Sequence, residues 1–377
     1  MTVAHTTVES VTSAAEERIA VATQWQLMWW RFCRHRLAVL GSIVVIAFYL
    51  VVVLADFLAY ADPSASEAAR SLMPAQGIHW FDGHSFRPHV HPVISGRDPL
   101  TFKMVHKADT SIEIPLRLFA HGFRYKFLGL LRTDRHLLGV QGAKAEDALF
   151  ILGTDLQGRD LWSRLMYGTR ISLTIGLVGV ALSLVLGILL GGMSGYYGGV
   201  VDTLIQRVIE IIRSIPTIPL WMGLAAALPR DWTITRIYFA ITIIISLIGW
   251  TELARVVRGR FLSLRAEQFV TAAELAGCSQ IRIIMRHMVP AFLSHIIATT
   301  TLAIPGMIIS ETSLSFLGLG LRPPAISLGV LLQQAQNVQT LALAPWLLFP
   351  GLVVIVAILA FNFMGDGLRD AADPYGG

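Results

Sequence analysis

Charged side chains are scarce in this sequence. Asp, Glu, Lys and Arg make up 15% of its 377 residues, whereas hydrophobic residues make up 54%. A typical soluble domain carries about 25% charged residues, so the composition argues against an ordinary soluble protein and against a disordered chain. Cysteine is rarer still, with Cys33 and Cys278 alone. Two cysteines exclude a disulfide-rich scaffold and lack the spacing of a zinc site.

Nucleotide-binding and catalytic motifs are also missing. A P-loop requires Gly-Lys followed by Ser or Thr, and no lysine of this sequence follows a glycine. No serine lies in a Gly-x-Ser-x-Gly elbow. We therefore expect no enzyme activity, no catalytic residue, no metal site and no cofactor in this chain, and a pump would need a separate motor.

Long apolar runs dominate what is present. A membrane-spanning helix needs roughly 20 apolar residues. The first run is longer than the roughly 7–15 residues of a signal-peptide core, so we expect a retained anchor. Six runs qualify as expected spans: 37–55, 171–201, 211–229, 237–251, 291–310 and 345–365.

Basic residues predict the orientation of these spans. Arg31, Arg34 and Arg36 precede the first span and place the N-terminus in the cytoplasm, because retained loops carry an excess of Lys and Arg. The loop between the fourth and fifth spans is then cytoplasmic. It is rich in arginine, at positions Arg255, Arg258, Arg260, Arg265, Arg282 and Arg286.

One polar stretch interrupts the membrane pattern. It follows the first span, and we expect a small extracytoplasmic insertion there, with strands around 111–131. His84, His89 and His91 invite a metal site, but their spacing favours solvated loop histidines. The expected division is therefore a cytoplasmic segment 1–36, a first transmembrane helix 37–58, an insertion 59–165, a five-helix core 166–365 with a cytoplasmic coupling loop 255–290, and a cytoplasmic tail 366–377.

Few ionisable residues occur in or near the later spans. A proton- or ion-driven carrier usually shows such groups within its spans. Four such residues are present: Glu210, Glu252, His295 and Glu311. We expect each of them to be interfacial and solvated, which favours an external motor over a secondary carrier.

The loop between the fourth and fifth spans has the pattern of a short helix, a turn and a second helix. Residues 266–275 have helix-forming composition, and Gly277 is a natural helix stop. A second helix over 280–287 follows, and Pro290 suits the first turn of the next span. Small side chains at Thr271, Ala272, Ala273 and Ala276 let another protein approach closely.

These residues resemble the EAA motif of ABC-importer permeases, E-A-A-x3-G-x9-h-x-x-P. Ala272, Ala273, Gly277 and Pro290 match it, His287 matches its peptide branch, and Thr271 stands where Glu is usual. Further resemblance extends over 151–173, 311–324, 344–374 and the N-terminal RHRLAVLG. The sequence is identified as a member of the permease subunits of dipeptide and oligopeptide ABC importers, of the C-type.

The resemblance implies a fold and a set of partners. It implies an all-α polytopic membrane protein with six transmembrane helices, the type I ABC importer permease fold. It also implies a second, B-type permease, two ATPase subunits that hold ATP and Mg²⁺, a periplasmic binding protein and the lipid bilayer of the bacterial cytoplasmic (inner) membrane, with both termini cytoplasmic. No nucleic acid is expected, because spans closely flank the helix-turn-helix.

The implied function is peptide import by alternating access. Oligosaccharides, opines and nickel are alternative cargoes of the same family. A secondary carrier or channel is the alternative of another class, and a membrane-anchored sensor lacks an output domain.

Two groups of site residues follow. The ATPase-coupling loop comprises Thr271, Ala272, Ala273, Glu274, Gly277, His287 and Pro290. We expect Ala273→Asp or Gly277→Pro to abolish transport while the chain stays in the membrane. The candidate pathway or gate comprises Ser313, Ser315, Phe316, Gly318 and Gly320, because broken helix at membrane depth lines protein or a water cavity. A simple periplasmic turn is the alternative for this segment.

Two local features complete the expectations. Gly153, Thr154 and Asp155 resemble a turn and helix cap before the second span. Asp155, Arg159 and Asp160 are expected to pair weakly at the outer surface. A glycine-rich run within the second span favours close helix packing over a hinge; it comprises Gly187, Gly191, Gly192, Gly195, Gly198 and Gly199.

Overall fold

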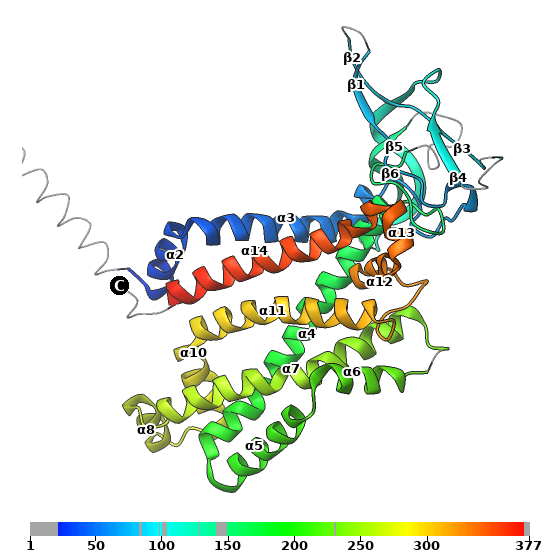
Figure 1. Cartoon of the computed structure of the whole chain (residues 1–377). Coiled ribbons are helices and arrows are strands. Elements are labelled where there is room, and N and C mark those ends of the chain that lie inside the picture. The colour runs from blue at the N-terminus through cyan, green and yellow to red at the C-terminus, as the bar shows by residue number, and fades with distance from the viewer. Residues whose placement is uncertain are drawn as a thin grey trace, which may run out of the picture.

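The protein has a helical body with a group of strands at one end (Figure 1). The computed structural model describes residues 22–82, 85–97, 99, 104–127, 129–140, 149–229 and 231–372. The expected end segments 1–36 and 366–377 lie only partly within these ranges, and His84 lies outside them.

Five described helices are long and apolar enough to cross a membrane. They are α3 (Arg36–Leu58), α4 (Leu161–Tyr197), α7 (Ile234–Leu264), α11 (Leu293–Phe316) and α14 (Phe349–Ala372). The expected third span is not one straight helix. It is replaced by α5 (Gly199–Ser214) and α6 (Thr217–Ala226), which meet at a bend of 86°. Pro216 lies at this break, where it cannot continue the ladder of helix α5. The described residues therefore hold five candidate spans, or six if the bent pair counts as one.

Shorter helical elements connect and flank the spans. Helix α2 (Gln24–Arg34) begins with a capping box between Thr23 and Gln26. The other helices are α8 (Gln268–Leu275), α9 (Gln280–Arg282), α10 (Val289–Ala291), α12 (Leu328–Gln333) and α13 (Val338–Leu343). Ile283–Met288 form a π-helical turn, and Ala68–Arg70, Gln334–Gln336 and Pro345–Leu348 form 3₁₀ turns.

The segment between α3 and α4 folds into strands, so the expected all-α class is wrong for this part. We name it the strand domain. It contains β1 (Ile78–Asp82), β2 (Ser85–Val90), β3 (Val93–Arg97), β4 (Met104–Ala108), β5 (Ile114–Phe127) and β6 (Leu131–Val140). An antiparallel sheet has the order β1-β2-β5-β6, and β3 pairs with β4 separately. The strands expected around 111–131 are confirmed by β5.

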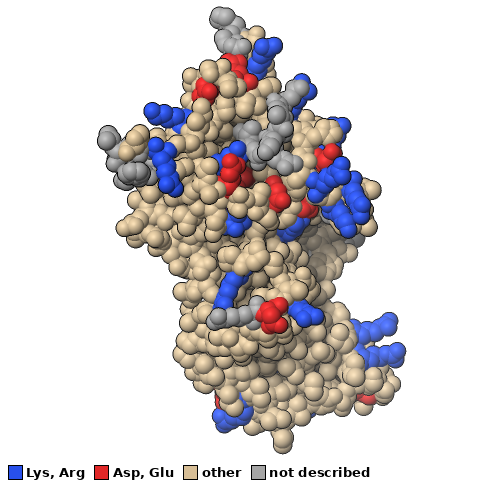
Figure 2. All heavy atoms as spheres, turned by 90° about the vertical axis from the view of Figure 1, so that its right-hand side faces the viewer, with Lys and Arg blue, Asp and Glu red and all other residues tan. Residues whose placement is uncertain are grey.

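Charge separates the strand domain from the helical body. Figure 2 looks at the end of the molecule that carries the strands, and most charged side chains of this face lie over its upper, strand-bearing part. Apolar side chains fill the body instead, where Leu173, Ile241 and Ile308 are fully buried in one cluster.

Glycines allow α4 and α7 to pack closely. A Cβ added at Gly187 would lie 2.7 Å from Leu253 Cβ, and one at Gly191 would lie 2.4 Å from Ala254 O. A Cβ at Gly195 would lie 2.5 Å from Phe261 Cβ. Such distances leave no room for a side chain, so the expected role in close helix packing is confirmed for Gly187, Gly191 and Gly195. Gly198 and Gly199 instead have φ values of +66° and +54° and lie where α4 ends and α5 begins.

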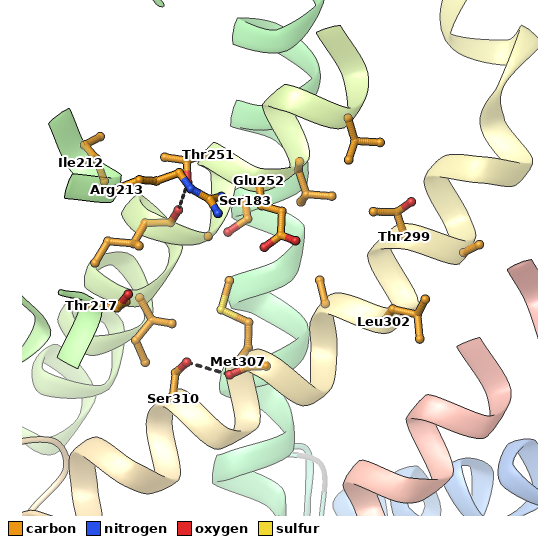
Figure 3. A pocket seen from close by; sticks show the side chains of 18 of the residues that line it. Ser183, Ile212, Arg213, Thr217, Thr251, Glu252, Thr299, Leu302, Met307 and Ser310 are labelled. Carbon is orange, nitrogen blue, oxygen red and sulfur yellow. Dashed lines mark hydrogen bonds between the residues drawn. The ribbon is translucent and has the colours of Figure 1, made fainter. Parts of the chain in front are cut away.

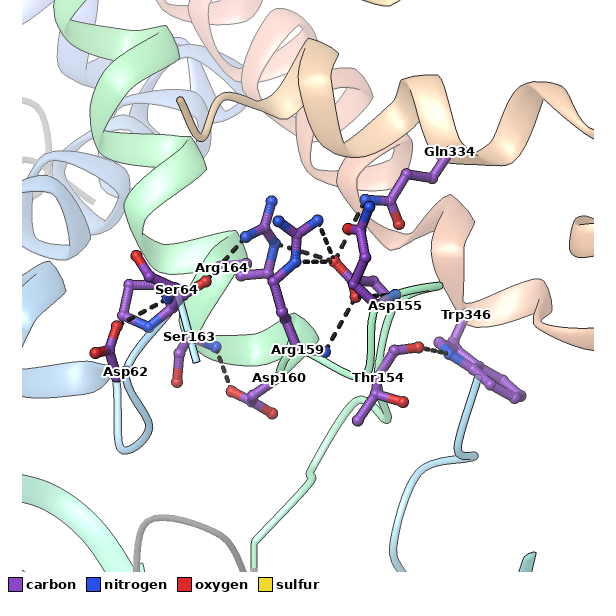
Figure 4. A network of polar contacts seen from close by, with 12 residues as sticks. Asp62, Ser64, Thr154, Asp155, Arg159, Asp160, Ser163, Arg164, Gln334 and Trp346 are labelled. Atoms are coloured by element: carbon purple, nitrogen blue, oxygen red, sulfur yellow. Dashed lines mark hydrogen bonds and ion pairs between the residues drawn. The ribbon is translucent and has the colours of Figure 1, made fainter. Parts of the chain in front are cut away.

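A buried polar junction joins the strand domain to the body (Figure 4). Asp155 is fully buried and receives hydrogen bonds from Arg159 Nε at 2.7 Å and from Gln334 Nε2 at 3.3 Å. Arg164 Nε lies 3.4 Å from the same carboxylate. Trp346 Nε1 donates to Thr154 O at 3.0 Å. The junction therefore links the start of α4 to the segments around α12 and α14.

Two expectations for this junction are wrong. Asp155, Arg159 and Asp160 were expected at the surface, but all three are buried. The helix cap is Asp160 and not the turn Gly153–Asp155, because Asp160 Oδ2 accepts from Ser163 N at 2.7 Å. Asp160 Oδ1 also accepts from Tyr60 OH at 2.8 Å. Spacing along the chain predicted charge pairs here but carried no information about the segments that cover them.

Burial affects the acid-base behaviour of this cap. It raises the pKa of Asp160 to about 6, and hydrogen bonds from Ser163 and Tyr60 offset only part of that rise. Burial and the neighbouring Asp160 together raise the pKa of Tyr60 well above its usual value.

Candidate functional site

The connection between α7 and α11, residues 265–292, forms a compact unit that we call the α7–α11 loop. It is shorter than the expected loop 255–290 at its N-terminal end, because α7 continues to Leu264. Arg255, Arg258 and Arg260 therefore lie on α7. Arg258 makes a bidentate pair with Asp202 of α5, with distances of 2.5 Å and 2.6 Å. This pair fixes the start of α5 against α7.

Helix α8 presents two different faces. Val270 and Ala273 point inward and belong to a buried cluster with Phe261 and Met288. Thr271 and Ala272 are exposed on the other face. Ala273 is only 7% exposed, so it does not belong to the surface expected to meet a partner. An aspartate at Ala273 would bury a charge inside the loop, and the effect expected of Ala273→Asp changes from lost docking to lost packing.

Gly277 ends α8 as the sequence predicts. Its φ of +72° is in the left-handed region, which favours glycine. The N–H of Cys278 donates to Ala273 O at 3.1 Å, and the N–H of Gly277 donates to Glu274 O at 3.0 Å. These bonds satisfy carbonyls at the helix end and turn the chain sharply.

The second half of the loop differs from the expected single helix over 280–287. A short α9 passes into the π-helical turn Ile283–Met288, which contains His287. π-Helical turns are rare and often accompany functional sites. Pro290 was expected in the first turn of the next span, but it lies in the three-residue helix α10, and the span α11 begins after it at Leu293.

A hydrogen bond connects α8 to the end of α4. Tyr196 OH donates to Glu274 Oε1 at 2.8 Å. Tyr196 is buried in the same cluster as Ala273. Helices α8 and α4 are therefore joined through both packing and this bond. The sequence identified Glu274 but gave no sign of Tyr196, because their contact depends on how α4 and α8 are placed in space.

The candidate gate residues form the end of α11. The helix continues through Ser313 and Ser315 to Phe316, and Gly318 has a φ of +75° beyond it. A Cβ at Gly320 would lie 2.6 Å from Ser315 Oγ. This segment is therefore a tightly folded helix end packed on itself.

Ser315 also belongs to a buried network around Glu311. The Glu311 carboxylate accepts from Ser172 Oγ of α4 at 2.7 Å and from Ser315 Oγ at 2.9 Å. Ser172 Oγ in turn accepts from Leu328 N of α12 at 3.1 Å. The expectation that Glu311 is solvated is wrong, because it is fully buried. Its hydrogen-bond partners compensate for its removal from water.

A cavity of about 640 Å³ lies between α4, α5, α6, α7 and α11, with Arg369 reaching it from the end of α14 (Figure 3). It has an apolar wall that includes Trp221 and Met307. Four ionisable side chains also line it, and they come from four different helices: Arg213, Glu252, His295 and Arg369. Glu252 and His295, expected at separate span ends, thus face one space.

The cavity adds residues that the sequence analysis missed. Arg213 and Arg369 were not singled out, although arginines beside apolar runs are a signal of a polar path. The gate residues Ser313–Gly320 are not among its lining residues, whereas Ser310, one turn earlier on α11, is.

Comparisons with known proteins assign the chain to a family. Residues 167–375, more than half of the chain, match the family described as binding-protein-dependent transport system inner membrane component. The chain belongs to this family. Residues 23–74 of the permease also match the N-terminal transmembrane domain of oligopeptide transport permease C. The strand domain lies between the two matched segments, whereas the cavity and the α7–α11 loop lie within the larger one.

Individual relatives cover most of the permease. The oligopeptide transport system permease protein OppC of Haemophilus influenzae is 39% identical over 64% of this chain and 75% of its own. OppC of Bacillus subtilis is 35% identical over 69% of this chain and 81% of its own. The dipeptide transport system permease protein DppC of Haemophilus influenzae is 38% identical over 60% and 74%. A chain of the MetNI methionine ABC transporter, solved in inward-facing conformations, has a TM-score of 0.42 and 17% identity over 55% of this chain and 95% of its own.

Proposed function

We propose that this permease is the membrane subunit of an ATP-driven importer of peptides. The observation that carries the proposal is the exposed face of α8 at Thr271 and Ala272, connected to α4 by the bond between Tyr196 and Glu274. The relatives named as oligopeptide and dipeptide permeases support peptides as the cargo.

The proposed motor is a pair of ATPase subunits, one of which receives the α7–α11 loop. Around α8 the loop exposes large apolar side chains, with Leu275 at 85% and Ile281 at 73%. Exposed apolar side chains of this size in one loop indicate a protein partner. ATP binding by the partner would move α8, and α4 would follow it. Import by alternating access needs contacts that differ between the two states.

The remaining proposed partners are a second permease and a solute-binding protein. The permease would lie in the bacterial inner membrane with the α7–α11 loop and both termini in the cytoplasm, as its arginines favour. The strand domain would then lie outside, on the side from which a binding protein delivers solute.

The cavity is the proposed stretch of the solute path within this subunit. Arg213 and Arg369 are suited to a carboxylate, and Glu252 is suited to an ammonium group, so a zwitterionic peptide finds both charges. Trp221 Nε1 lines the same space as a buried donor without a hydrogen-bond partner among the described residues. An unpaired donor in such a wall favours a ligand with carbonyl acceptors, as a peptide has.

Co-purification and transport together test the proposal. The tagged chain is extracted in mild detergent from its native cells, and the partners are identified by mass spectrometry. The recovered complex is then reconstituted, and uptake of labelled dipeptides and tripeptides is measured with and without ATP. We expect an ATPase, a second permease and a binding protein, with uptake that requires ATP.

Other outcomes would assign another function. Competition by an oligosaccharide, an opine or nickel, and not by peptides, would replace the cargo but keep the importer. Uptake by the chain alone, driven by an ion gradient, would replace the importer with a secondary carrier or channel.

A further inference from the structure

The β1–β2 hairpin exposes a cluster of aromatic side chains. Trp80, Phe81 and Phe86 are 54%, 64% and 66% exposed. The rings of Trp80 and Phe86 are stacked with their centroids 6.4 Å apart, and Phe81 meets Phe86 edge-on at 5.7 Å. Three large aromatic side chains in mutual contact form an apolar patch, which soluble surfaces rarely display without a partner. We call these three residues the aromatic patch.

A β-bulge gathers the aromatic patch on the hairpin. In a regular strand, neighbours such as Trp80 and Phe81 point to opposite faces. The pairing of β1 with β2 shifts register between His79 and Phe81, where Trp80 alone lies opposite two residues of β2, Arg87 and Pro88. The extra residue of the bulge is therefore on β2. Across this irregular pairing, both Trp80 and Phe81 contact Phe86.

The aromatic patch lies on an unprotected edge. β1 is the outer strand in the order β1-β2-β5-β6, with no further strand beside it among the described residues. An apolar edge strand is a hazard for edge-to-edge association unless something covers it. The described part of the chain does not cover this one.

The position of the hairpin indicates what covers it. Figure 1 shows the β1–β2 hairpin projecting from the strand domain on the side of α3, away from α7 and α11. The strand domain is held to the end of α3, because His136 Nδ1 lies 3.1 Å from Asp56 O and Phe119 packs on Phe57 with ring centroids 6.0 Å apart. The hairpin therefore extends sideways from the end of a membrane-spanning helix.

One side of helix α3 faces away from the body along most of the helix. In the most apolar 18-residue stretch of α3, only 17% is buried within the chain. Its exposed face carries Leu40, Ile43, Leu50 and Val53. A spanning helix with such a face is suited to contact with lipid, and the hairpin then overhangs the bilayer beside α3.

We propose that the aromatic patch inserts into the headgroup region of the bilayer beside α3, on the strand-domain side. Trp is enriched at this depth, where an apolar ring and polar surroundings are both available. Phe occurs with Trp on the apolar face of segments that lie in this interface. Lipid contact covers the apolar edge of β1 and continues the apolar face of α3. The strand domain is thereby held to the membrane surface at a second point, beyond its junction with α4.

A depth measurement tests this inference without depending on the cargo. A nitroxide label is placed at Phe81→Cys in the full chain in lipid nanodiscs, after Cys33→Ser and Cys278→Ala remove the native thiols. Ile94→Cys on β3, which is 61% exposed, is the matched control. Collision rates with oxygen, which enters lipid, and with a water-soluble nickel chelate are measured at both positions.

The label at position 81 should be closer to lipid than the label at position 94. We expect the ratio of oxygen to nickel collisions to be several-fold higher at position 81 than at position 94. Equal ratios would show that the aromatic patch lies in water and would overturn the proposal. If the Phe81 variant does not fold, the same label at Trp80→Cys gives the same test.

If a protein and not lipid covers the aromatic patch, the collision rates should follow a different pattern. The measurement is repeated after adding the solute-binding protein, and with the second permease present and absent. Shielding from nickel that appears only with one of these proteins would assign the aromatic patch to that protein and overturn the lipid assignment. Shielding in nanodiscs of the chain alone, lost in small detergent micelles, supports the bilayer.

Discussion

The two ends of α4 are built in opposite ways. At its N-terminal end, Asp155, Asp160 and Arg164 are buried among segments from distant parts of the chain. At its C-terminal end, Tyr196 makes one hydrogen bond to Glu274, whose side chain lies on an exposed loop. Ser194, in the last turn of α4, also donates a hydrogen bond to Asp202 of α5. One end of the helix is held by a buried charged network, and the other is connected by packing and by the hydrogen bonds of Tyr196 and Ser194.

This difference indicates which end is free to move. A buried charge that loses its partner costs several kcal/mol, so the junction at Asp155 has one favourable arrangement. A hydrogen bond near the surface contributes about 0.5–1.5 kcal/mol, so the contact at Glu274 can be remade in a second position. We infer that α4 carries motion from the α7–α11 loop toward a fixed anchor near the strand domain.

Removal of the central carboxylate should have the largest effect. Asp155→Ala leaves Arg159 and Arg164 buried without their carboxylate counter-charge and is expected to cost about 3–5 kcal/mol of unfolding free energy. That is a large share of a typical stability of about 5–15 kcal/mol. The protein should accumulate poorly in the membrane and unfold at lower temperature in detergent.

Glu67→Ala is the control for this variant. Glu67 pairs with Arg70 at 3.2 Å but is half exposed, so its removal should cost less than about 1 kcal/mol. Equal stability of the Asp155 and Glu67 variants would contradict the description of Asp155 as the centre of a buried anchor.

Substitutions at two neighbouring residues of α8 should distinguish an effect on packing from an effect on docking. Ala273→Asp places a charge in the cluster with Phe261 and should destabilise the loop by several kcal/mol. Ala272→Asp changes only the exposed face and should leave stability within about 0.5 kcal/mol. Its expected effect is loss of ATP-driven uptake with normal abundance in the membrane, measured in reconstituted vesicles.

A different result would contradict the prediction for each of these two variants. Normal uptake by Ala272→Asp would show that this face of α8 does not meet the ATPase. A thermal unfolding curve of Ala273→Asp identical to that of the parent would show that Ala273 is not packed inside the loop.

The cap at Asp160 should make the anchored end sensitive to pH. Its folded pKa of about 6 lies above the ordinary value of about 3.9, so the folded protein binds more protons between these values. The contribution of Asp160 to the free energy of unfolding is therefore highest below about pH 4. It falls by up to about 3 kcal/mol as pH rises through 6.

Asp160→Asn removes this titration while keeping a side chain that can cap a helix. The difference in melting temperature between the parent and this variant should change steadily from pH 4 to pH 6.5. A constant difference over that range would contradict a raised pKa at Asp160.

The smallest effect is expected at the opposite end. Tyr196→Phe removes the bond to Glu274 and should cost about 1 kcal/mol, with a modest decrease in uptake per ATP hydrolysed. A double-mutant cycle with Glu274→Gln should show that the two changes are not additive. Strict additivity would mean that this bond does not couple α8 to α4.

The sequence predicted the features that depend on local composition. Uninterrupted apolar runs identified α3, α4, α7, α11 and α14, because a span must be apolar wherever it packs. Gly277 marked a helix end because few other residues adopt its backbone conformation. The spacing of Ala272, Gly277 and Pro290 led to the family that the comparisons confirm.

Expectations failed where distant segments meet. The run 211–229 is apolar throughout, but Pro216 and the packing around α5 and α6 make it a bent pair. Glu311 and Asp155 were expected near water because charged residues usually are, and both are buried by segments more than a hundred residues away in the chain. Ala273 and Ala272 are indistinguishable by composition, yet one faces inward and the other faces outward.

The sequence by itself determined that this chain is a membrane protein, which five runs form long apolar helices and which family it belongs to. These properties follow from side-chain polarity and short-range spacing, which are local. Only the tertiary structure decided which charges are buried, which face of α8 is free and which helices share the cavity. Those properties depend on partners brought together by folding, and the free energy of a polar group is set by what surrounds it.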